Sequence, residues 1–168
     1  MKCLTFWVTC FTLILLNGCG FHLRGIHTLP LWLNPITIIL EKADPTWIPL
    51  LREQFNVAHV TVMENPTQAR YWLSIKHEQV DQNIISISSG SSPRQYQLTY
   101  HVTFSLQQAH GKEILAPTTI LVTRPLTINN DRILGSHDEE AQLINEMRRD
   151  AAMQMLYRLT PLSHTKTP

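Results

Sequence analysis

Residues 95–107 read QYQLTYHVTFSLQ, in which polar and apolar side chains alternate without a break. A period of two sends successive side chains to opposite faces of a strand, so this segment predicts a strand with one buried and one wet face. At about 3.4 Å per residue it would span about 40 Å, which is long for a globular protein. The buried face would carry Tyr96, Leu98, Tyr100, Val102, Phe104 and Leu106.

Extended segments lie on both sides of this strand. Residues 72–87 are extended in character, and the serine-rich stretch 86–93 predicts a loop before the central strand. After it, residues 109–112 predict a hairpin turn and residues 114–128 a returning strand. Pro117 and Pro125 confine that strand to an edge or interrupt it, because proline cannot donate to a neighbouring strand.

Two helices and two shorter strands complete the pattern. Residues 36–40 are β-branched and predict a buried strand, residues 48–56 repeat apolar residues at helical spacing, and residues 57–63 alternate weakly. Ser136 and Glu139 form a capping box before an apolar stripe that reaches Leu159. We therefore expect an α+β fold, a two-layer sandwich with one mixed or antiparallel sheet of about four strands and two helices on one face.

The first 19 residues differ in composition from the rest. Lys2 precedes an apolar run, Cys3–Leu16, that is too short to span a bilayer and is typical of a signal peptide. Leu16-Asn17-Gly18-Cys19 follows the pattern of a bacterial lipobox, which predicts cleavage after residue 18 and acylation of Cys19. The alternative is an ordinary secretory signal with an incidental cysteine. Gly20, in place of aspartate, favours transport to the outer membrane.

The rest of the chain suits one domain. Residues 1–18 would be the signal peptide, 19–35 a lipidated tether, 36–160 the α+β domain and 161–168 a disordered tail. Residues 20–168 contain no cysteine, which excludes disulfides, cysteine-based metal sites and cysteine nucleophiles there.

Catalytic and metal-binding motifs are lacking in the sequence. The eight histidines have no metal-ligand spacing, and there is no phosphate-binding glycine loop or nucleophile elbow. Asp138–Glu140 are interpreted as the acidic start of a helix, and Arg148-Arg149 as a solvated face or a partner contact. The net charge of +1 predicts no nucleic-acid footprint. We expect neither an enzyme, nor a cofactor, nor a metal site.

The low content of charged residues points to an interaction surface. Only 16% of residues are charged, against a usual ~25%. An uncharged polar strand face can pack against another polar surface without desolvating charges. Its candidate contact residues are Gln97, Thr99 and Thr103.

The string Cys19-Gly20-Phe21-His22-Leu23-Arg24-Gly25 resembles the start of mature LPS-assembly lipoproteins of the LptE family. The order of predicted elements is similar across most of the mature chain. The resemblance implies a non-enzymatic, lipid-anchored plug inside an LptD-like outer-membrane β-barrel that exports lipopolysaccharide, on its periplasmic side. It also implies binding of lipopolysaccharide by basic loop residues, for which Arg94 and Arg132 are the nearest candidates.

Two other hypotheses remain. One is a stand-alone outer-membrane lipoprotein that binds glycan or lipid with Trp72 and the loop Ser86–Arg94. The other is a periplasmic hydrolase, which only scattered His and Ser residues would support.

Overall fold

The computed structural model describes residues 29–87, 93–109, 111–127 and 133–160. The signal peptide, Cys19, the motif Gly20–Gly25, Arg132 and the tail lie outside these ranges. Along the chain run η1 (Leu31–Leu33), β1 (Ile36–Leu40), α2 (Trp47–Val57), β2 (Val62–Met63), η2 (Pro66–Gln68), β3 (Tyr71–Ile87), β4 (Pro93–Gln108), β5 (Glu113–Thr127) and α3 (Ile133–Leu159). None of the helices in the described part is long and apolar enough to cross a membrane.

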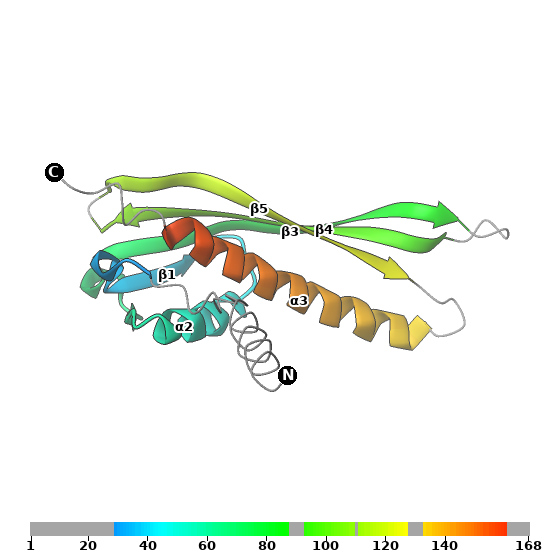
Figure 1. The fold of residues 1–168 in the computed structure, drawn as a ribbon, viewed down its shortest axis with the longest axis horizontal. Helices are drawn as coiled ribbons and strands as arrows, with labels where there is room; N and C mark the ends of the chain where they lie inside the picture. Colours follow the sequence, from blue (N-terminus) through cyan, green and yellow to red (C-terminus); the bar gives the residue numbers. More distant parts are fainter. Residues whose placement is uncertain (1–28, 88–92, 110, 128–132, 161–168) are drawn as a thin grey trace, which may run out of the picture.

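One mixed sheet organises the described residues (Figure 1). Its strand order is β2-β1-β3-β4-β5, with β1 parallel to β2 and β3 and the other neighbours antiparallel. The predicted α+β class is confirmed, with five strands where about four were expected. β2 lies within the weakly alternating residues 57–63 and is short, because only Val62 and Met63 pair with β1.

Strand β4 has the alternation that the sequence predicts. Its inward side chains are fully buried at 0% exposure from Leu98 to Leu106, while Gln97, Thr99 and Thr103 face the other way and are exposed or half-buried. The edge position predicted for the proline-containing strand is also confirmed, since among the described strands β5 has β4 as its single neighbour.

Strand β3 contains a bulge that the sequence analysis missed. The pairing with β4 shifts between Ile75 and His77, so Lys76 is the extra residue. Leu73 and Ile75 are buried in the core before the bulge, and Glu78 opposes the buried Val102 after it. The bulge thus turns even-numbered residues of β3 inward.

The two long strands extend into the predicted serine loop. Ser86 and Ile87 belong to β3, and β4 begins at Pro93, so the prediction of a loop over 86–93 was too wide. Pairing of Ser86 with Gln95 and of Ile87 with Pro93 accounts for the difference, because each extra pair satisfies backbone groups.

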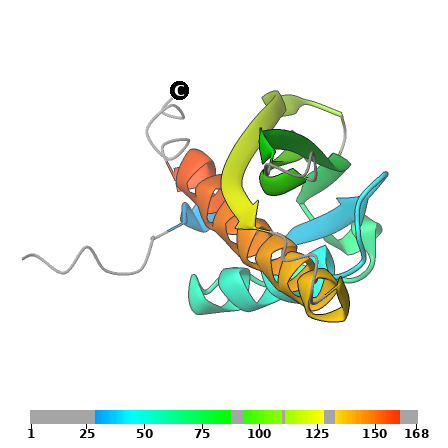
Figure 2. The same cartoon turned by 90° about the vertical axis from the view of Figure 1, so that its right-hand side faces the viewer.

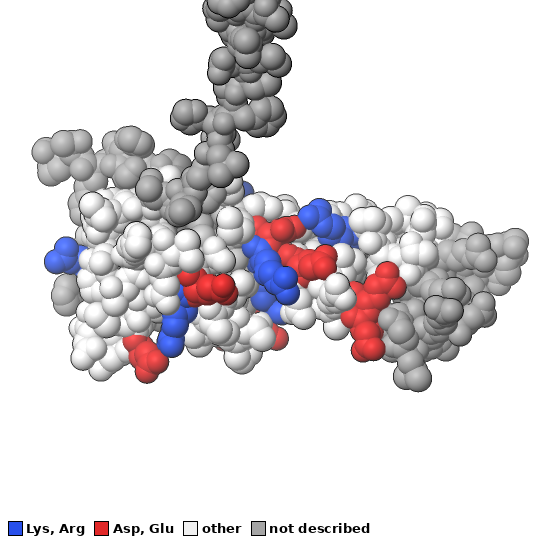
Figure 3. Space-filling model, turned by 60° about the horizontal axis from the view of Figure 1, so that its bottom comes forward, with Lys and Arg blue, Asp and Glu red and all other residues white. Residues whose placement is uncertain are grey.

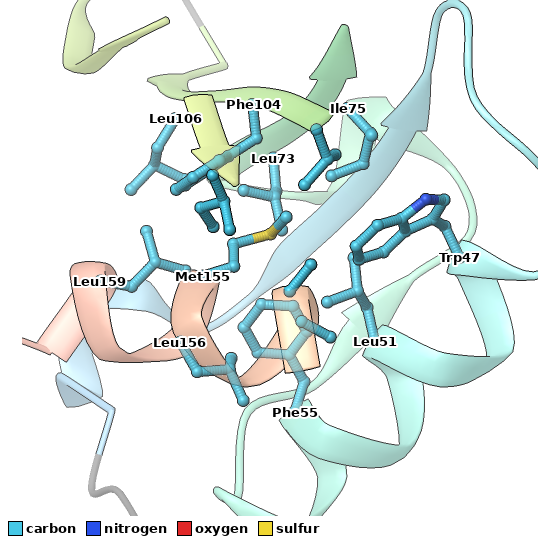
Figure 4. Close-up of a cluster of buried hydrophobic side chains, with 14 of the residues drawn as sticks. Trp47, Leu51, Phe55, Leu73, Ile75, Phe104, Leu106, Met155, Leu156 and Leu159 are labelled. Atoms are coloured by element: carbon cyan, nitrogen blue, oxygen red, sulfur yellow. The ribbon is translucent and has the colours of Figure 1, made fainter. Parts of the chain in front are cut away.

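Both helices lie on the same face of the sheet, as Figures 1 and 2 show together, which confirms the two-layer sandwich. α2 buries Trp47, Leu51 and Phe55 against the sheet (Figure 4). α3 adds a stripe of small and apolar side chains: Met147, Ala151, Ala152, Met155, Leu156 and Leu159. None of the described helices lies on the opposite face of the sheet, which we call the outer face.

Two boundaries differ from the predictions. α3 begins at Ile133, so Ser136 lies inside the helix and is not its N-cap, and Asp138–Glu140 are not in the first turn. No proline separates Ile133 from Ser136, and the helix adds this turn although Gly135 disfavours it. At the other end, Leu29 and Leu33 of the predicted tether are buried in the core.

Candidate functional site

The outer face of β3, β4 and β5 is a polar surface with almost no formal charge. On this face, from His77 to Asn83 and at the positions paired with them, there is one carboxylate, Asp81, and neither lysine nor arginine; a second carboxylate, Glu113, pairs with Gln107 toward one end of the sheet. The central positions are His77, Gln79, Asp81 and Asn83 of β3; Gln97, Thr99, His101 and Thr103 of β4; and Thr119, Leu121, Thr123 and Pro125 of β5. By contrast, the helix-bearing side in Figure 3 displays groups of both cations and anions.

Hydrogen bonds join the side chains of this face into a row. His77 Nε2 and Gln79 Oε1 are 3.3 Å apart, and Gln79 Nε2 donates to Asp81 Oδ1 at 2.6 Å. The other oxygen of Asp81 lies 3.0 Å from His101 Nε2. The row therefore holds amide, imidazole and carboxylate groups in set positions before any partner arrives, which lowers the entropy cost of docking.

The middle of the outer face is lined by threonines. Thr103 Oγ1 and Thr119 Oγ1 are 2.9 Å apart across β4 and β5. Thr99 pairs with Asp81 on one side and Thr123 on the other. Hydroxyl groups both donate and accept, so this surface can match many patterns of polar groups on a partner.

The structure brings some of the predicted contact residues together and leaves others undescribed. Gln97, Thr99 and Thr103 share the outer face, as the alternation predicts. Arg94 belongs to β4, but its side chain is not described, and Arg132 lies outside the described residues. Direct contact of any of these with lipopolysaccharide or a partner stays a prediction.

The residues proposed for a stand-alone glycan or lipid site do not gather around an open platform. Trp72 is half-buried, and its Nε1 donates to the carbonyl oxygen of Pro66 at 3.0 Å. Trp72 pairs with Gln107, near one end of β4, whereas Ser86 pairs with Gln95 near the other end. Residues 88–92 of that proposed loop lie outside the described part.

Beneath the sheet, a buried charged cluster connects both helices to it. Glu78 Oε1 accepts from Tyr100 Oη at 2.5 Å and from Arg148 Nη2 at 2.8 Å and Nε at 3.0 Å. Glu78 Oε2 accepts from Trp47 Nε1 at 3.1 Å and from the backbone N–H of Asp44 at 2.7 Å. The cluster thus ties β3 and β4 to α3 and to the start of α2.

Arg148 is buried in this cluster, so its interpretation as a solvated face or partner contact was wrong. Its side chain and that of Glu78 are each 9% exposed, whereas neighbouring Arg149 is exposed. The sequence hint of a buried Arg148 was its position directly after the core residue Met147 on the helix. The bulge at Lys76, which turns Glu78 inward, supplies its buried counter-ion, and Asp44 Oδ2 lies 3.7 Å from Arg148 Nη2.

The cluster shifts the pKa values of its members in opposite directions. Burial alone would raise the pKa of Glu78, but hydrogen bonds from Tyr100, the Asp44 backbone and Arg148, with the charge of Arg148, hold it below its usual range. Burial, together with the hydrogen bond and negative charge of Glu78, raises the pKa of Tyr100. Glu78 is therefore ionised and Tyr100 neutral at physiological pH, and the cluster stabilises the fold.

The described residues offer no metal centre: no three His, Cys, Asp or Glu side chains among them are grouped to hold an ion. The open surface pockets along the described residues include one of about 590 Å³ along α2 and one of about 450 Å³ at the start of β3. The α2 pocket is lined by Ile48, Pro49, Arg52, Glu53, Asn56 and Val57. Its one cation, Arg52, pairs with Glu64 at 3.2 Å.

Comparison with known proteins decides the family. The family model LptE, described as lipopolysaccharide-assembly, matches residues 49–159, which include most of α2 and the whole of β2–β5 and α3. The chain belongs to the LptE family. The "LPS-assembly lipoprotein LptE" of Yersinia enterocolitica is 31% identical over 146 residues, which cover 84% of this chain and 68% of the relative.

Further relatives agree with this assignment. The "LPS-assembly lipoprotein LptE" of Pectobacterium atrosepticum is 28% identical over 150 residues, or 87% of this chain and 79% of that protein. Among solved structures, an uncharacterized lipoprotein B from Nitrosomonas europaea aligns with a TM-score of 0.70 and 25% identity, over 87% of this chain and 94% of that one.

Another solved structure supports the fold alone. The rare lipoprotein B from Shewanella oneidensis aligns with a TM-score of 0.61 at 22% identity, over 73% of this chain and 92% of that one. The alternative of a stand-alone glycan- or lipid-binding lipoprotein is not favoured by these relatives, whose names specify LPS assembly.

Proposed function

We propose that this LptE-family protein is a lipid-anchored, non-enzymatic assembly factor of the outer membrane. It docks its outer face against the polar interior of the LPS-assembly β-barrel, an LptD-like partner. In that position it supports folding of the barrel and delivery of lipopolysaccharide to the cell surface. Acylated Cys19 holds it on the periplasmic side, because several acyl chains together bind a bilayer firmly.

The observation that carries this proposal is the outer face. Of its twelve central side chains on three strands, nine present amide, hydroxyl or imidazole groups, and the one carboxylate among them, Asp81, lies 3.0 Å from His101. The lumen of a membrane barrel is polar, so such a face gains hydrogen bonds there while few charges lose water. A soluble protein with no partner for this face would normally expose more lysine and glutamate.

Depletion of the protein tests the proposal. Cells in which its synthesis is shut off are expected to lose folded, functional barrel and to accumulate less lipopolysaccharide at the surface. The amount of folded barrel is followed by its heat-modifiable mobility in gels, and surface lipopolysaccharide by labelling of intact cells. Normal levels of both after depletion would contradict the proposal.

The site of acylation has its own test. The mature protein purified from membranes should have the mass of residues 19–168 plus the acyl groups. A Cys19→Ala variant should lose the added mass and appear in the soluble periplasmic fraction. A mature protein without acyl groups would contradict acylation of Cys19. The proposed docking on the barrel is tested separately, by depletion.

A further inference from the structure

One end of the sheet gathers three chain segments that are far apart in the sequence. The backbone N–H groups of Arg70 and Tyr71 donate to the carbonyl oxygen of Pro35 at 3.0 and 3.3 Å, and the N–H of Ala109 donates to that of Arg70 at 2.9 Å. The start of β1, the start of β3 and the end of β4 therefore meet here, at the left of Figure 1. We call this the anchor end.

The chain enters the fold at the anchor end. Leu29 is buried, and Leu31 in the following 3₁₀ turn is 88% exposed, which is the largest exposure among the described large apolar side chains. Trp32 packs edge-on against Tyr71, with ring centroids 5.0 Å apart, and so fixes this turn beside Arg70. An exposed leucine next to a half-buried tryptophan is a composition typical of membrane-interface segments.

Chain length limits how far this end can lie from an acylated Cys19. Ten Cα steps separate Cys19 from Leu29, and a fully extended chain covers at most about 35 Å over that distance. The 16 residues of β4 extend about 54 Å at 3.4 Å each, so the two ends of the sheet differ greatly in their possible distance from the membrane. The anchor end therefore lies within about 35 Å of an acylated Cys19.

A polar pocket of about 450 Å³ opens at the anchor end. Arg70 lines it together with Thr67, Gln68 and Gln108, and the hairpin that carries Lys112 is joined to it by the hydrogen bond from Gln108 N–H to the Lys112 carbonyl oxygen at 2.8 Å. Among the described residues, the side chains of Arg70 and Lys112 form no ion pair, which is also true of Lys42, Arg149 and Arg158, whereas Arg52, Lys76, Arg124 and Arg148 each have a carboxylate partner.

We propose that the anchor end is a membrane-contact site, in which Leu31 enters the interface of the phospholipid leaflet while Arg70 and Lys112 bind the phosphates of anionic phospholipids. The proposal rests on acylation of Cys19, since the anchor and the two cations must share one leaflet. A guanidinium group binds phosphate oxygens through two parallel hydrogen bonds, and the threonine and amide side chains of the pocket can bind a glycerol headgroup. The contact would fix the tilt of the long sheet relative to the membrane.

The absence of cysteine after Cys19 allows a direct test on the acylated protein. A fluorophore at Leu31→Cys reports contact of the anchor end with lipid, and the same fluorophore at Ile84→Cys is the matched control. Ile84 is also an apolar residue, 56% exposed, and it lies toward the other end of β3. The protein is reconstituted into phosphatidylcholine vesicles with or without phosphatidylglycerol, and nitroxide-labelled lipids quench dye that touches the bilayer.

The proposal predicts strong quenching at position 31 in phosphatidylglycerol vesicles and little at position 84. Each cation near an anionic surface contributes about 1 kcal/mol, or a factor of about five, so Arg70→Gln and Lys112→Gln should each lower the ratio of docked to undocked protein about fivefold. Arg70→Lys should retain most of the contact. Glu113→Gln, which removes the carboxylate next to Lys112, should increase it.

Three results would overturn this inference. The first is equal quenching at positions 31 and 84. The second is quenching at position 31 that is the same with and without phosphatidylglycerol and is not changed by either charge substitution. The third is quenching that appears only when lipopolysaccharide is added. The proposed function fails separately, when the mass of the mature protein shows no acylation or when depletion leaves the barrel intact.

Discussion

Phe104 and Thr103 are neighbours in β4 whose side chains point to opposite faces of the sheet. Phe104 is fully buried among core residues (Figure 4), whereas Thr103 is on the outer face. Phe104→Asp should unfold the domain, because it removes a large apolar side chain and buries a charge, at a cost of several kcal/mol. Thr103→Asp should cost no more than about 1 kcal/mol. Urea unfolding followed by circular dichroism measures the stability of both variants. An equal loss of stability in both would contradict the interpretation that β4 has one buried and one exposed face.

The ion pair of Glu78 and Arg148 predicts that removing one charge destabilises the protein more than removing both. Arg148→Ala leaves a buried carboxylate without its cation, so it should reduce the free energy of unfolding by about 3 kcal/mol or more. Glu78→Gln in the Arg148→Met background should recover most of that loss, because no charge stays buried. A double variant as unstable as Arg148→Ala would show that the charge is not the cause.

The lowered pKa of Glu78 predicts acid sensitivity. A carboxyl group whose folded-state pKa lies below its unfolded value of 4.5 contributes stability well above pH 4.5, and this contribution is lost as the pH falls through the folded-state pKa. The wild-type protein should therefore lose stability below pH 4.5 more steeply than Glu78→Gln. Urea unfolding at a series of pH values gives the change of stability with pH for both proteins. The same change in both would contradict the lowered pKa of Glu78.

At the scale of elements, α3 depends on small side chains where it crosses the sheet. Ala151 and Ala152 are buried, and Met153 of the same helix turn is partly exposed. Ala151→Leu should destabilise the protein by about 1–3 kcal/mol, because the extra carbons have no space between helix and sheet. Met153→Leu is the control and should change stability by less than about 0.5 kcal/mol. A tolerated Ala151→Leu would mean that α3 is loosely packed.

The elements that the sequence predicts well are those with local, uninterrupted patterns. The alternation of Tyr96–Leu106 predicts both faces of β4, and two prolines predict the edge position of β5. The bulge at Lys76 has no such signal, since it is set by pairing with β4 and changes which face every later residue of β3 occupies. The inward turn of Glu78, and hence the burial of Arg148, could not be predicted without it.

The candidate site was predictable in part for the same reason. Gln97, Thr99 and Thr103 belong to one strand, so their common face follows from the period of two. His77, Gln79 and Asp81 join them only through the register of β3 against β4, in which Gln79 pairs with His101 and Asp81 with Thr99. The pairing register of two strands that are distant in sequence cannot be predicted from the sequence of either strand alone.

At the scale of the whole molecule, the two faces of the sheet differ in composition and in role. The helix side contains the hydrophobic core and the buried Glu78–Arg148 pair, which give the domain its stability. The outer face contributes little to the core and presents hydrogen-bonding groups along most of the sheet. The proposed docking of the outer face on a partner would account for the low share of charged residues, 16%, because that face would then not be exposed to water.

The most direct test of the central claim places charge on the outer face without changing its shape. Asn83→Asp and Gln97→Glu lie on neighbouring strands and are paired in register. The matched control, Asn56→Asp with Gln154→Glu, makes the same chemical changes at exposed positions of α2 and α3.

The measurement is the amount of barrel partner that co-purifies with each tagged variant from outer membranes, at equal amounts of tagged chain. The outer-face variant should retain about a tenth of the wild-type partner or less, because the added carboxylates must lose water on docking. The control variant should retain all of it. Equal recovery of the barrel with both variants would contradict docking through the outer face.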